Sequence, residues 1–214
     1  MRKHKAKKHL EQKAKKEKKK TPKEKLITWI IIIVMVFSVI GFMGTGLFEK
    51  GQFEYNGYEF FQISSGWSTE VNGKKIDLMY HPTQVDYLPL DNQITNLLKQ
   101  NRVIALTFDP DEELISGISQ TRLDFGLIGM NVLDKIIVDS VTNESEEYTL
   151  PVITCANATE YMPVIYMKKS EKTDAILNNS CIMLEFKTEL ELMQLSNKIL
   201  YAMMDIIPSE QSVE

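Results

Sequence analysis

The sequence predicts an α/β or α+β fold, with one transmembrane helix followed by a domain that contains a mixed sheet. Residues 26–48 form a 23-residue apolar run that contains no Asp, Glu, Lys or Arg. After this run, short apolar stretches of strand composition alternate with stretches of helical spacing, a pattern typical of interleaved strands and helices. An amphipathic segment near the C-terminus closes the domain with a capped helix.

The charged residues divide the chain into three chemically different pieces. Residues 1–25 contain 13 of the 25 Lys and Arg residues but only three of the 29 Asp and Glu residues. Residues 49–214 therefore hold 12 basic and 26 acidic side chains, a net charge of −14. We expect residues 1–25 to be a disordered tail that is attracted to anionic lipid head groups. No aromatic residues interleave with its lysines, which argues against nucleic acid as a partner.

The apolar run is long enough to act as a signal-anchor in the lipid bilayer. At about 1.5 Å per residue it spans roughly 34 Å, compared with about 30 Å for the hydrocarbon core. The basic flank places the N-terminus in the cytoplasm and residues 49–214 outside the cell membrane. A cleaved signal peptide and a buried core helix are the alternatives. Ser38, Gly41 and Thr45 share one face, which would permit self-association through this helix; the alternative is that glycine is simply common in membrane helices.

The outer region begins with a predicted juxtamembrane linker at residues 49–57, followed by a domain at residues 58–208. Residues 58–80 predict antiparallel strands, with a hairpin turn at Asn72-Gly73. A short helix is expected at 92–100 behind Asp91, and a longer one after residues 109–113. Further strands are expected at residues 103–108, 135–141, 152–154, 164–167 and 181–186.

The final helix has the clearest sequence signals. Thr188 and Glu191 form a T-x-x-E capping box, and apolar residues follow on one face as far as Ile206. Pro208 ends the run, and residues 209–214 are expected to be a frayed tail.

Cys155 and Cys181 are the only cysteines, and both lie in the region predicted to be outside. An even cysteine count in an oxidising compartment predicts a disulfide, with two independent buried thiols as the alternative. Asn143, Asn157 and Asn178 begin N-x-S/T sequons and are glycosylation candidates.

Asp109 and Asp111, with Glu112 and Glu113, follow a predicted buried strand. Carboxylates beyond the end of such a strand could hold Ca²⁺ or Mg²⁺, so Asp109 and Asp111 are candidate metal ligands. Acidic residues are also favourable in the first turn of a helix, and helix capping is the preferred explanation. His81, the one histidine after the apolar run, is expected at the surface or at a strand edge.

Residues 151–207 contain TCANATEYMPVIYM, NNSCIMLEF and KILYAMMDII, which follow a Cys-x-x-Ala-Thr, Pro-Val-Ile, Cys-Ile order. In this order the C-terminal part resembles a group of uncharacterised single-pass, membrane-anchored surface proteins of archaeal type. The resemblance implies an anchored outer domain and brings no catalytic residue and no cofactor.

The sequence thus predicts an anchored binding or scaffolding module with an undefined protein partner. The alternative is a surface hydrolase that uses carboxylates, with or without a divalent cation.

Overall fold

The computed structural model describes residue 26, residues 28–35 and residues 52–208. The chain forms two compact units, residues 1–49 and 50–214, which are described separately. Residues 28–35 are helical. No helix within the described ranges is long and apolar enough to cross a membrane. Most of the predicted anchor at 26–48, the basic tail and residues 209–214 lie outside those ranges.

The second unit begins with a four-stranded antiparallel meander. Its strands are β1 (Gln52–Tyr55), β2 (Tyr58–Ile63), β3 (Gly66–Val71) and β4 (Lys74–Leu78), paired in that order. Asn72 and Gly73 have φ values of 53° and 74°, the left-handed conformation expected of a tight hairpin turn. Asn56 and Gly57 form an equivalent turn. The predicted linker at 49–57 is therefore partly wrong, because β1 pairs with β2.

A mixed sheet follows, as predicted, with the strand order β6-β5-β7-β9-β8. Strands β5 (Val103–Phe108), β6 (Ile136–Val141), β7 (Val164–Lys169) and β9 (Cys181–Phe186) are parallel, and β8 (Asp174–Asn178) pairs antiparallel with β9. Strand β8 was not predicted. The strand expected at 152–154 is reduced to an isolated bridge between Val152 and Val141.

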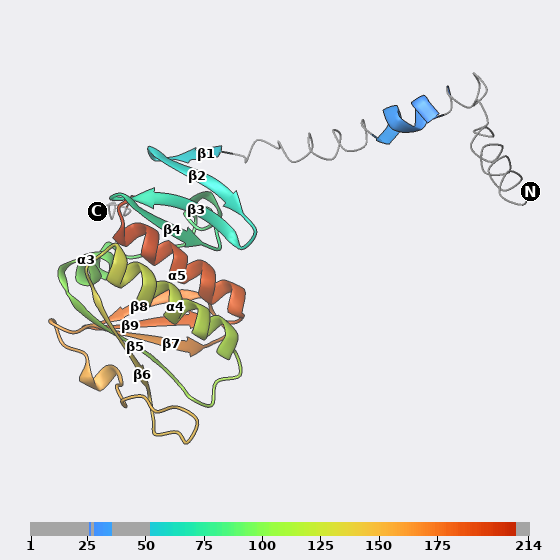
Figure 1. The fold of residues 1–214 in the computed structure, drawn as a ribbon. Coiled ribbons are helices and arrows are strands. Elements are labelled where there is room, and N and C mark those ends of the chain that lie inside the picture. The colour runs from blue at the N-terminus through green and yellow to red at the C-terminus, as the bar shows by residue number, and fades with distance from the viewer. Residues whose placement is uncertain (1–25, 27, 36–51, 209–214) are drawn as a thin grey trace, which may run out of the picture. The chain divides into compact units, whose positions relative to one another are not determined.

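Three helices pack in this unit: α3 (Asn92–Gln100), α4 (Ile115–Asn131) and α5 (Glu189–Met203). Figure 1 shows α4 and α5 between the meander and the mixed sheet. Their apolar side chains join those of both sheets in one core that includes Phe60, Ile118 and Tyr201. The predicted caps are confirmed, because Asp91 accepts the Gln93 N–H and Thr188 forms a reciprocal capping box with Glu191.

The opposite face of the mixed sheet has a smaller apolar cluster. Buried Ala105, Val164 and Cys181 pack there against Ile153 and Cys155 from the segment between β6 and β7. This segment includes the short 3₁₀ helix η2 (Cys155–Asn157). The predicted disulfide is present: Cys155 and Cys181 are bonded, with their Cα atoms 5.2 Å apart. It fixes the covering segment to the start of β9.

Candidate interaction surface on helix α4

Helix α4 has apolar residues on two sides. On its inner side, Ile118, Phe125 and Ile128 are buried in the core. A Cβ atom at Gly129 would lie 2.9 Å from Ile137, so glycine lets the helix approach β6 closely. This close seating brings the outer side of α4 next to the first strand of the mixed sheet.

The outer side of α4 carries apolar side chains that remain exposed to solvent. Leu123, Leu127 and Met130 are 52%, 49% and 61% exposed. They line an open groove of about 340 Å³ on the outer side of α4, which reaches β6 at Asp139. We call this region the α4–β6 surface; its residues are Ser119, Arg122, Leu123, Gly126, Leu127, Met130 and Asp139. Contiguous exposed apolar side chains of this kind are typical of interaction sites.

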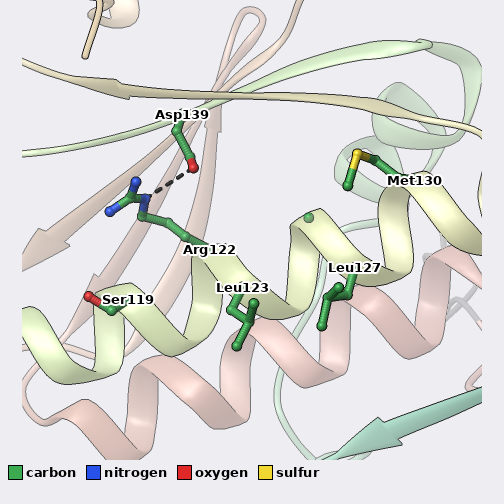
Figure 2. A pocket seen from close by; sticks show the side chains of 7 residues that line it. Ser119, Arg122, Leu123, Leu127, Met130 and Asp139 are labelled. Atoms are coloured by element: carbon green, nitrogen blue, oxygen red, sulfur yellow. Dashed lines mark hydrogen bonds and ion pairs between the residues drawn. The ribbon is translucent and has the colours of Figure 1, made fainter. Parts of the chain in front are cut away.

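The charged residues of the α4–β6 surface neutralise each other. Arg122 Nε donates a hydrogen bond to Asp139 Oδ1 at 3.0 Å, and Figure 2 shows the Arg122 side chain reaching from α4 to β6. The guanidinium also lies over the Phe108 ring, 5.0 Å from its centroid. Both contacts hold the Arg122 side chain, and because its charge is paired with that of Asp139 the surface carries no net charge.

Strand β6 forms one edge of the mixed sheet, and part of its backbone points outward. The Ile136 N–H donates to Arg102 O and the Thr142 N–H donates to Phe108 O, so alternate residues face β5. The residues between them, Ile137 and Asp139, therefore direct their N–H and C=O groups away from β5. In the described part of the chain, only Val141 is paired on that side, by the bridge to Val152.

A second hollow, of about 190 Å³, lies between α4 and β4 and contains Asp124. Asp124 is 7% exposed. Burial raises its pKa to about 6, although hydrogen bonds from Gln120, at 2.7 Å, and from Asn197 lower it. A carboxyl group with such a pKa can exchange a proton near neutral pH. Sequence analysis did not single out Asp124, because an acid within an amphipathic helix usually lies on its solvent face.

The acidic cluster at residues 109–113 does not cap α4. This helix begins at Ile115 behind Leu114, has no side-chain cap and has no acid in its first turn, so the capping explanation is wrong. Instead, Asp109 Oδ1 accepts the Asp111 N–H at 3.1 Å within a turn, and Glu113 pairs with Lys169. No group of three or more potential metal-ligating side chains was found in the described ranges. A metal site at Asp109 and Asp111 stays a prediction.

The sequon asparagines are all exposed. Asn143 and Asn157 lie in the segment that covers the mixed sheet, and Asn178 ends β8. Asn157 also accepts the Thr154 N–H at 2.9 Å, so its side chain helps to shape η2. Their glycosylation stays a prediction.

His81 is buried, which corrects the expectation of a surface histidine. It is 5% exposed, and its ring centroid lies 4.7 Å from that of Trp67 and 4.8 Å from that of Phe60. Burial lowers the pKa of His81, and nearby Asp86 opposes this shift. Its Nδ1 lies 2.9 Å from Thr83 Oγ1, and the ring caps the turn at residues 82–84. These contacts give His81 a structural role.

Comparisons with family models, curated proteins and solved structures found no match to this chain.

Proposed function

We propose that this protein is a membrane-anchored binding module whose outer domain contacts a protein partner through the α4–β6 surface. The observation that carries the proposal is the exposed apolar side of α4 next to an open strand edge. Leaving Leu123, Leu127 and Met130 in water forgoes the stabilisation that burial of apolar surface provides, about 25 cal/mol per Å². A protein partner that covers these side chains would recover it.

The proposed location of the domain on the extracytoplasmic side of the membrane rests on the sequence and on the disulfide. Residues 26–48 provide the proposed anchor, and the basic residues before it favour a cytoplasmic N-terminus. Disulfides persist in oxidising compartments, so the bond between Cys155 and Cys181 supports an extracytoplasmic domain. The basic tail would then contact anionic head groups on the cytoplasmic side.

The hydrolase alternative has less support. It requires Asp109 and Asp111 to converge with other carboxylates in a cavity. Neither residue lines the α4–β6 groove or the hollow that contains Asp124. Asp109 instead shapes its own turn. Because Asp109 and Asp111 line neither of these hollows, binding is favoured over catalysis.

Site-specific photo-cross-linking in intact membranes tests the proposed function. A photoreactive phenylalanine analogue at Leu123 should give a protein adduct, because this side chain would lie inside the interface. The matched control places the same group at exposed Glu171, in the turn before β8 at the other edge of the sheet. Adducts of equal yield at both positions, or none at Leu123, would contradict the proposal.

A further inference from the structure

The α4–β6 surface combines two features that a single partner can satisfy together. The backbone groups of Ile137 and Asp139 point outward from the sheet, while the side chains of the same residues lie on the helix side, near Gly129 and Arg122. A strand added at this edge would pair with the open backbone groups. Its side chains on the same face would meet the apolar flank of α4.

The charge of the domain indicates which kind of partner fits. Residues 49–214 carry a net charge of −14, so two copies repel each other over most of their surfaces. The α4–β6 surface is an exception, because its Arg122 and Asp139 are paired and its other residues are uncharged. A basic partner attracted by charge would favour the acidic surface elsewhere. A neutral apolar surface is where two like-charged copies meet with least repulsion.

Two-fold symmetry makes this surface complementary to itself. A strand edge related to its own copy by a two-fold axis pairs antiparallel, so the same residues act on both sides. With Val138 at the axis, Ile137 of one copy lies opposite Asp139 of the other. This register satisfies the outward N–H and C=O groups of both residues in each copy. It also avoids placing the two Asp139 carboxylates opposite each other.

We infer that the partner at the α4–β6 surface is a second copy of this chain, joined through antiparallel β6 strands and adjacent α4 helices. The inference rests on the proposed binding function and names its partner. The exposed side chains of Leu123, Leu127 and Met130 then pack against their counterparts across the axis. Anchoring both copies in one membrane favours the contact, because it raises their effective concentration.

Cross-linking of single introduced cysteines in the full-length chain tests this pairing. The two native cysteines are bonded to each other, so one introduced cysteine is the sole thiol that a bis-maleimide can reach. Gly126→Cys places it on the outer side of α4, where a Cβ meets nothing within 4 Å. Glu171→Cys is the control, in the turn beside β8 at the opposite edge.

In membranes that contain two differently tagged copies, Gly126→Cys should give a cross-linked species of twice the 24.6 kDa chain mass carrying both tags. Glu171→Cys should give little of it. Adding Leu123→Lys and Met130→Lys to Gly126→Cys should reduce the dimer at least about tenfold, because four cations would face each other across the axis. Thermal unfolding of each variant checks that it remains folded.

Each outcome decides between explanations. If Gly126→Cys yields no more dimer than Glu171→Cys, a second copy is excluded as the partner at the α4–β6 surface. This holds whether the copies meet through another surface or do not meet at all. If Gly126→Cys yields no excess of dimer while the photoreactive group at Leu123 captures a different protein, the binding function stands and the inference fails. If the Leu123 group also captures nothing, both are wrong.

Discussion

Replacing Cys155 and Cys181 together with alanine should lower the free energy of unfolding by about 3.5 kcal/mol. The two residues are 26 positions apart, and the chain-entropy relation for a closed loop of that length gives this value at 25 °C. Alanine is chosen because Cys181 packs against Ala105 and Val164. A serine hydroxyl at this apolar position would be removed from water, which would add a separate destabilising effect. The effect of the double replacement arises because the unfolded chain gains freedom when the cross-link is absent.

Thermal unfolding of the full-length protein in detergent, followed by circular dichroism, measures this change. For a domain of this size, 1 kcal/mol corresponds to about 2–4 °C, so the melting temperature should fall by roughly 7–14 °C. Reductant should lower the melting temperature of the native protein by a similar amount. It should leave the double alanine variant unchanged. A variant that melts with the native protein, or native protein that is insensitive to reductant, would refute the reasoning.

Two further predictions concern the helix layer and the meander. Burial raises the pKa of Asp124 from 3.8 to about 6, so the folded protein binds this proton more tightly than the unfolded chain does. The free energy of unfolding should therefore fall by on the order of 3 kcal/mol as the pH rises from about 4 to about 6. Urea unfolding across this range should show that fall, and Asp124→Asn should abolish it; an equal fall in the variant would exclude Asp124 as the cause. Gly66→Ala should lower the free energy of unfolding by at least about 3 kcal/mol, because its Cβ would clash with the Leu78 carbonyl oxygen and φ is +143°. Gly73→Ala, with φ +74° and open space around it, should cost only about 1 kcal/mol, and equal urea midpoints for the two variants would contradict this account.

Local chemistry made several elements predictable. The caps at Asp91 and Thr188 use hydrogen bonds between residues two or three positions apart, so the sequence alone contains both partners. The Asn72-Gly73 turn is equally local, because it needs only residues that tolerate positive φ. The disulfide could be expected because the chain has only one possible cysteine pair.

The missed elements depend on contacts that are distant in sequence. Strand β8 exists because Asp174–Asn178 pairs with β9 across the Asn179 turn, and its short sequence is not distinctive by itself. The apolar outer side of α4 was also missed. Leu123 and Leu127 fit a helical core pattern as well as Phe125 and Ile128 do, and only tertiary packing decides which side is covered.

The link between Cys155 and Cys181 also determines what a protease can release. Glu171 and Lys172 are exposed in the turn between β7 and β8, which makes this turn open to cleavage. A single cut there would leave Cys155 on one fragment and Cys181 on the other. The final helix, α5, would therefore stay covalently attached to the N-terminal fragment. Release of the C-terminal fragment would require reduction of the disulfide as well as proteolysis.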